Sequence, residues 1–133
     1  MKKEYSIFLD EIKIGTTELE KADAPMRVVF GVIKFIERNK GYNFIKDYCE
    51  SNNIELASDY PEDKLISTMT IDSLTVKNEK GIEVKGIGNQ ISGMDNDEFE
   101  ITLLGVPYPF FEEEFPHHMK EYNEMFNEQK TKA

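Results

Sequence analysis

The residues of this chain that could do chemistry gather in one acidic and aromatic segment, residues 95–114. Its carboxylates form two groups, one on each side of a run that contains aromatic residues and two prolines. Aromatic side chains are enriched in protein interfaces, and a dense negative field speeds encounter with a basic partner. The pattern predicts a partner-binding surface made of the following residues: Asp95, Asp97, Glu98, Glu100, Tyr108, Phe110, Phe111, Glu112, Glu113 and Glu114.

A purely structural role is the alternative for the same segment. Phe110, Phe111 and Phe115 could be core residues that anchor a C-terminal helix. The carboxylates of residues 112–114 precede that helix, whose dipole favours negative charge at its start. This alternative accounts for the second acidic group better than for the first.

The other constellations in the sequence match known chemistry poorly. His117 and His118 would point about 100° apart on a helix, so they do not easily share one metal ion. Residues 95–98 lack the later glycine and glutamate of a calcium loop, and residues 86–93 lack the third glycine of a phosphate-binding loop. Cys49 has no base near it in sequence. We therefore expect no catalytic residue, no metal site and no cofactor, and a protein that is not an enzyme.

The net charge of the chain limits the kinds of partner that it can bind. The chain has 133 residues with 16 basic and 26 acidic side chains, so its net charge is 16 − 26 = −10. Phosphates and anionic lipids attract Lys and Arg, so this charge argues against nucleic-acid and membrane partners. Residues 1–52 carry nine basic and nine acidic side chains, and the whole excess lies in residues 53–133. The chain has a single cysteine, so it cannot form an internal disulfide. It also has no apolar run that suits a signal peptide or a membrane helix. Both observations favour a cytoplasmic location for the protein.

Hydrophobic periodicity and turn residues predict an α+β domain. Isoleucine outnumbers leucine by thirteen to seven, and alanine is scarce, which favours strands over helices. We expect two hairpins, at residues 4–15 and at 74–77 with 82–87, and a buried central strand at 28–36. Shorter strands are expected at 54–57, 65–71 and 99–106. Residues 16–25 are predicted to be a loop or a short helix. We expect helices at 41–52 and 116–129, the latter with an apolar stripe of Met119, Tyr122, Met125 and Phe126.

The predicted fold is a mostly antiparallel sheet of about six to eight strands with a central helix and a C-terminal helix. The length suits one domain, which we place at residues 1–129, followed by a frayed tail at residues 130–133.

The acidic groups at residues 95–100 and 112–114, with Tyr108, Phe110 and Phe111 between them, resemble in type those of small acidic immunity proteins of bacterial competition systems, such as contact-dependent inhibition. The resemblance spans the chain loosely, because immunity proteins have many unrelated folds and share no motif position by position. It implies a cytoplasmic, non-catalytic protein that binds and neutralises a cognate toxin domain. The implied partner is a basic domain, often a nuclease, because a nuclease must hold phosphates.

Two other functions fit the sequence. A non-catalytic adaptor, chaperone or assembly subunit would share the strand-rich plan, although a chaperone or homo-oligomer would expose an apolar rather than a charged surface. A small enzyme that uses carboxylates as general acid and base is the third, but only a pair with separated pKa values in a cleft would support it. The sequence leaves the oligomeric state open.

Overall fold

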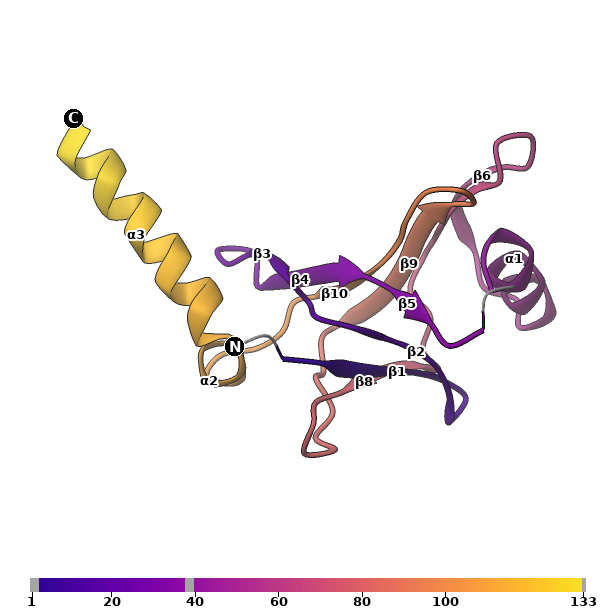
Figure 1. Cartoon of the computed structure of the whole chain (residues 1–133), viewed down its shortest axis with the longest axis horizontal. Helices are drawn as coiled ribbons and strands as arrows, with labels where there is room; N and C mark the ends of the chain where they lie inside the picture. Colours follow the sequence, from indigo (N-terminus) through magenta and orange to yellow (C-terminus); the bar gives the residue numbers. More distant parts are fainter. Residues whose placement is uncertain (1–2, 38–39, 133) are drawn as a thin grey trace.

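Two antiparallel sheets make up the body of the protein, in a computed structural model that describes residues 3–37 and 40–132, with side chains as far as residue 125. The order of the four-stranded sheet is β5 (Lys34–Phe35), β2 (Ile12–Thr17), β1 (Tyr5–Leu9), β8 (Leu74–Lys77). The order of the six-stranded sheet is β3 (Lys21–Asp23), β4 (Val28–Val32), β10 (Phe99–Leu104), β9 (Gly88–Met94), β7 (Leu65–Thr68), β6 (Leu56–Tyr60). The helices are α1 (Tyr42–Ser51), α2 (Phe110–Glu114) and α3 (Pro116–Lys132) (Figure 1). The predicted α+β class is confirmed, with the described strands divided between two sheets.

Each sheet turns one apolar face into a common core. Strands β1 and β10 alternate between buried and half-buried residues, so that Tyr5, Ile7 and Leu9 point inward from one sheet and Ile101 and Leu103 from the other. This period of two is the pattern of a strand with one covered face. Burying each such side chain contributes about 1.5–3 kcal/mol to folding.

The first strands form the predicted hairpin, and the segment after it also pairs. The turn between β1 and β2 is made by Asp10 and Glu11, both with positive φ, as a two-residue turn of type I′ requires. Within residues 16–25, which were predicted to be a loop or short helix, residues 16–17 end β2 and residues 21–23 form β3, while residues 18–20 are a loop and residues 24–25 belong to a turn. Strand β3 lies at an edge of the six-stranded sheet and pairs with β4 alone.

The apolar run at residues 28–36 enters both sheets rather than one. Strand β4 pairs with β3 and β10, whereas β5 pairs with β2 in the other sheet. The predicted central strand is therefore broken at Ile33, whose N–H donates to the carbonyl of Phe99 at 2.8 Å. Gly31 marks a close approach, because a Cβ there would lie 2.6 Å from Oγ1 of Thr17. Periodicity could not reveal the change of sheet, since apolar side chains on both sides of it pack into the same core.

The predicted hairpin of residues 74–77 with 82–87 forms its turn, where the N–H of Val84 donates to the carbonyl of Val76 at 2.8 Å, but its second arm is not a strand. Strand β8 forms, but its partner segment contributes an isolated bridge between Lys77 and Glu83. Strand β9, which the sequence analysis did not predict, follows instead and pairs with β7 and β10. The glycines of β9 weaken its strand signal in the sequence, but they are needed where the neighbouring backbone comes close. A Cβ at Gly93 would lie 2.6 Å from Cα of Phe99.

Helices α1 and α3 lie at opposite ends of the long axis of the molecule (Figure 1). Helix α1 matches the predicted helix and buries Tyr42, Ile45 and Cys49. Helix α3 starts at the predicted Pro116 but continues through Lys132, where a tail was predicted, and the side chain of Phe126 lies outside the described residues. The short α2, which was not predicted, connects α3 to β10. No described helix has the length and apolar character needed to span a membrane.

Candidate protein-binding groove

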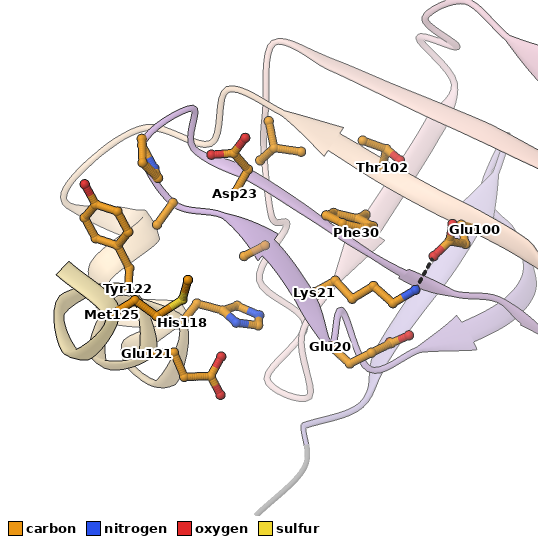
Figure 2. A pocket seen from close by; sticks show the side chains of 14 residues that line it. Glu20, Lys21, Asp23, Phe30, Glu100, Thr102, His118, Glu121, Tyr122 and Met125 are labelled. Atoms are coloured by element: carbon orange, nitrogen blue, oxygen red, sulfur yellow. Dashed lines mark hydrogen bonds and ion pairs between the residues drawn. The ribbon is translucent and has the colours of Figure 1, made fainter. Parts of the chain in front are cut away.

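An open groove of about 960 Å³ lies between α3 and the outer face of the six-stranded sheet (Figure 2). Strands β3, β4 and β10 form its floor, and α3 forms one wall. The turn between β3 and β4 closes one end with Ala24 and Pro25. Figure 2 shows side chains of α3 on one side of the groove and those of the sheet on the other.

The floor is built by the side chains that face away from the core. Val28 and Phe30 alternate with the buried Val29 on β4, and Thr102 follows the buried Ile101 on β10. Phe30 pairs in register with Thr102, so the two lie side by side on the outer face. The centre of the floor is therefore apolar and aromatic, although it belongs to the outside of the sheet.

One cation lies on this floor. The Nζ of Lys21 lies 5.8 Å from the centre of the Phe30 ring and forms an ion pair with Glu100 at 3.0 Å. The hydrogen bond that the Lys21 ammonium donates to Glu100, together with the charge of that carboxylate, raises the pKa of Lys21, so this group stays charged at neutral pH. The pair is exposed to solvent, which screens it, so it contributes little to stability.

The wall of the groove is anchored at the start of α3. Phe115 is fully buried, with its ring centre 5.5 Å from that of Phe111. His118 is 4% exposed, and its Nε2 lies 2.8 Å from the carbonyl oxygen of Leu19. From this fixed base the helix rises away from the sheets (Figure 1), and Met125 reaches 61% exposure.

The groove carries an excess of negative charge. Its lining includes Glu20, Asp23, Glu100 and Glu121, against one ammonium on Lys21, which gives a formal charge of 1 − 4 = −3 with histidine neutral. The carboxylate of Glu20 is held by the backbone N–H of Val32 at 2.9 Å. Glu20, Asp23 and Glu121 form no ion pair with another described residue. Carboxylates around an apolar floor are suited to a cationic, amphipathic partner.

The first predicted acidic group divides between two places. Asp95 caps α1, because its Oδ1 accepts the N–H of Tyr42 at 3.0 Å. Asp97 and Glu98 lie exposed in the turn between β9 and β10, in a hollow that they share with Asp95 and two lysines. Glu100 points to the groove. The three carboxylates of the turn are therefore at the opposite end of β10 from the second acidic group, about 20 Å along the strand.

The three predicted aromatic residues differ in their burial. Phe111 is fully buried, and Phe110 is half-buried against the core. Tyr108 is 42% exposed, and its hydroxyl donates to the carbonyl of Ala24 at 3.2 Å, which ties it to the turn at the end of the groove. The guanidinium of Arg27 lies 5.9 Å from the Tyr108 ring centre. Tyr108 therefore supports the groove from behind, and the core role that was the alternative accounts for Phe111.

The carboxylates of α2 also divide. Glu112 and Glu113 are exposed and form no ion pair with described residues. Glu114 accepts hydrogen bonds from the Tyr5 hydroxyl at 2.8 Å and from Nδ2 of Asn78 at 2.9 Å, and Lys3 lies 3.4 Å away. Burial alone would raise the pKa of Glu114, but these hydrogen bonds and the Lys3 charge outweigh it and lower the pKa. Glu114 therefore joins α2 to the first strand.

Several residues of the groove were missed by the sequence analysis: Glu20, Asp23, Val28, Phe30, Thr102 and Glu121. They come from three separate stretches of chain and share no motif. The apolar stripe of the C-terminal helix was the one available signal, since its described members beyond the first turn stay largely exposed.

The cysteine and the two histidines, which were the other candidates for chemistry, occupy positions that do not favour reactivity or metal binding. Cys49 is fully buried, and burial raises the pKa of its thiol, which disfavours the reactive thiolate. The rings of His117 and His118 lie 4.1 Å apart, and burial together with the neighbouring His118 lowers the pKa of His117. Within the part of the chain that the structure describes, no three His, Cys, Asp or Glu side chains are grouped so that they could hold a metal ion.

Comparison with known proteins yields no relative: no family model, curated protein or solved structure matches this chain.

Proposed function

We propose that this protein is an immunity-type inhibitor, which binds a basic toxin domain through the groove beside α3 and neutralises it by covering its surface. The observation that carries the proposal is the combination of an apolar floor with a rim of carboxylates. Phe30 and Val28 supply the floor. The rim has three carboxylates that form no ion pair with a described side chain: Glu20, Asp23 and Glu121.

Both halves of this arrangement have a role in binding. The excess negative charge of the whole chain steers a basic partner to the surface, and the groove then holds it by desolvated contacts. Close charge pairs across such an interface are worth about 1.5–7 kcal/mol of coupling. The same carboxylates repel one another in the free protein, so a basic partner relieves that repulsion. The proposed site of action is the cytoplasm, where an immunity protein meets an incoming toxin.

The predicted binding residues take different places in this proposal. Glu100 lines the groove, and Tyr108 supports its end. Four further residues were predicted as contacts but are exposed outside the groove: Asp97, Glu98, Glu112 and Glu113. In this proposal they add to the negative charge that attracts the partner and do not contact the segment held in the groove.

The test starts by capturing partners of the tagged full chain in its native host, at about 50 mM and then about 200 mM salt, since charge-driven binding weakens over that range. A recovered basic polypeptide is then expressed in a host that lacks this protein. Its toxicity is measured alone, with the wild-type chain, with Glu121→Lys, and with Glu112→Lys as the matched control. Both variants change the net charge from −10 to −8, but only Glu121 lies in the groove.

We expect the wild-type chain and Glu112→Lys to restore growth, and Glu121→Lys to protect at least tenfold less, as loss of one close charge pair at an interface predicts. A recovered partner whose activity is unaffected by stoichiometric binding would overturn neutralisation and favour an adaptor or assembly subunit. Recovery of the chain alone would overturn binding to a basic protein altogether.

A further inference from the structure

We infer that the segment received by the groove is an amphipathic α-helix with basic residues on both sides of an apolar stripe. The inference rests on the proposed function, because the helix would belong to the bound domain. It goes further in stating the conformation, the polarity and the charge pattern of the segment that enters. Three features of the groove lead to it.

The first feature is the hydrogen bonding of the floor, which excludes an extended segment. Strand β4 is paired on both sides, with β3 and β10, and β10 is paired with β4 and β9. Their backbone groups are therefore occupied, and an extended peptide laid over Phe30 would find none to pair with. Unpaired backbone groups on an apolar floor are costly, whereas a helix satisfies its own.

The edge of the sheet is a poor alternative for an extended peptide. Strand β3 is three residues long, and both of its ends, Lys21 and Asp23, carry exposed charges. Short, charged edge strands disfavour the addition of another strand. A peptide in this region is therefore received on the face of the sheet and not at its edge.

The second feature is the shape of the apolar surface. The floor offers Val28 and Phe30, and α3 offers Met125 from the wall (Figure 2). A helix laid in the groove would present side chains at i, i+3, i+4 and i+7 to these residues, as helices do in other grooves. It would also pack beside α3, which forms the wall of the groove.

The third feature is charge. The groove has a formal charge of −3, and Glu121 faces it from the wall with no ion pair among the described residues. A second copy of this chain is disfavoured as the occupant, because it would bring another net charge of −10. Lys or Arg on the flanks of an apolar stripe would place cations next to Glu20 and Glu121.

Lys21 shows within the molecule what the floor accepts. Its ammonium contacts the Glu100 carboxylate at 3.0 Å and lies 5.8 Å from the centre of the Phe30 ring. An aliphatic stem that ends in a cation therefore fits over the aromatic floor. A basic helix would repeat this arrangement at the carboxylates that have no ion pair.

The experiment uses the full chain as bait for a displayed library of helical peptides of about 15–20 residues, long enough to hold a helix. Apolar residues are fixed at i, i+3, i+4 and i+7, and the flanking positions vary among Lys, Glu and Gln. A second library presents the same compositions in proline-interrupted, non-helical form. Selected peptides are synthesised, and their affinity is measured by fluorescence anisotropy for the wild-type chain and three variants.

The three variants distinguish the effect of contacts in the groove from the effect of the net charge of the chain. Thr102→Arg places a long side chain on the floor, and Glu121→Lys reverses one charge on the wall. Glu112→Lys makes the same change in charge on α2, away from the groove. We expect the helical library alone to be enriched, with Lys on its flanks. Each groove variant should weaken binding by at least about tenfold, and Glu112→Lys by less than about twofold.

Three outcomes would overturn the inference: enrichment of the non-helical library, enrichment of Glu on the flanks, or equal losses for Glu121→Lys and Glu112→Lys. Absence of any enriched helix would also overturn it. These failures are distinct from failure of the proposed function. Neutralisation that survives Thr102→Arg would place the toxin elsewhere on the surface, whereas groove binding without neutralisation would leave a helix-binding adaptor.

Discussion

Helices α1 and α3 occupy opposite ends of the molecule and are held in different ways. Three residues of the ten-residue α1 are buried, and its start is capped by Asp95 from another part of the chain. The seventeen-residue α3 is anchored by its first turn, where His118 is buried, and its surface is exposed from Lys120 to Met125. Helix α1 completes the core, whereas α3 carries surface that the core does not use.

The hollows beside α1 and α3 also differ, in how far their carboxylates are balanced by lysines. Beside α1, the carboxylates Asp95, Asp97 and Glu98 share their hollow with Lys40 and Lys64, a sum of 2 − 3 = −1. Beside α3, four carboxylates share the groove with one lysine, a sum of −3, around an aromatic floor. The density of acids along the sequence therefore does not locate the negative surface; local compensation does.

The largest effect is expected at the base of α3. Phe115→Ala removes a fully buried ring that packs on Tyr5 and Phe111, and it should lower the free energy of unfolding by about 3–5 kcal/mol. Ile45→Ala, at the centre of the α1 contact, is the counterpart, with about 2–5 kcal/mol expected. Urea denaturation measures both. A loss below about 1 kcal/mol for Phe115→Ala would mean that α3 is not anchored in the core.

The next effect concerns the carboxylate that ties α2 to β1. The pKa of Glu114 is lowered in the folded protein, so its contribution to stability is present above its unfolded pKa, about 4.3, and is lost as pH falls through the folded value. Glu114→Gln should cost about 1–3 kcal/mol at pH 7 and less at pH 3. Urea denaturation at the two pH values measures this.

Glu112→Gln is the control for that experiment, because Glu112 is exposed on the same short helix and no described residue forms an ion pair with it. Its stability should follow the wild type at both pH values. If Glu114→Gln also kept the full acid dependence, the network around Tyr5 and Asn78 would not be its source.

A smaller effect is expected at the cap of α1. Asp95→Ala leaves the N–H of Tyr42 without its acceptor and should cost about 0.5–2 kcal/mol, as removal of a helix cap does. Asp95→Asn keeps an oxygen acceptor and should cost less than half of that. Thermal unfolding compares the two with Asp97→Ala, an exposed neighbour that should be neutral. Equal losses for all three would show that Asp95 is not a cap.

The smallest effect is expected on the exposed part of α3. Met125→Ala should change the free energy of unfolding by less than about 0.5 kcal/mol, because the side chain is 61% exposed. The same change should weaken binding of the selected helical peptide several-fold. A large loss of stability would show that the wall of the groove supports the fold, and the contrast between α1 and α3 would then disappear.

The sequence predicted the elements that have a clear period and clear ends. The hairpin of β1 and β2, helix α1, strand β10 and the start of α3 at Pro116 all lie where expected. Their signals are local, since each depends on residues within one turn of helix or a few positions of strand. The sequence-based prediction of strands was wrong at Ile33 and at β9, because strands distant in sequence decide the pairing there.

The candidate site was predictable only in its general character. The negative charge, the apolar stripe of the C-terminal helix and Glu100 were visible in the sequence, whereas the exposure of that stripe was not. Phe30 was not, because a half-exposed aromatic residue on the outer face of a strand reads like a core residue. Glu20 and Glu121 gain a role only when the chain brings β3 and α3 together.

The sequence by itself determined the class of fold and the sign of the surface charge, because periodicity and composition are properties of the chain alone. Only the tertiary structure decided which acids are engaged and which remain uncompensated. Glu114 and Glu121 are seven positions apart, yet one is held by Asn78 and Tyr5 and the other faces an open groove. The physical reason is that a charge is neutralised by the groups that folding places within a few ångströms of it, whatever their distance along the chain.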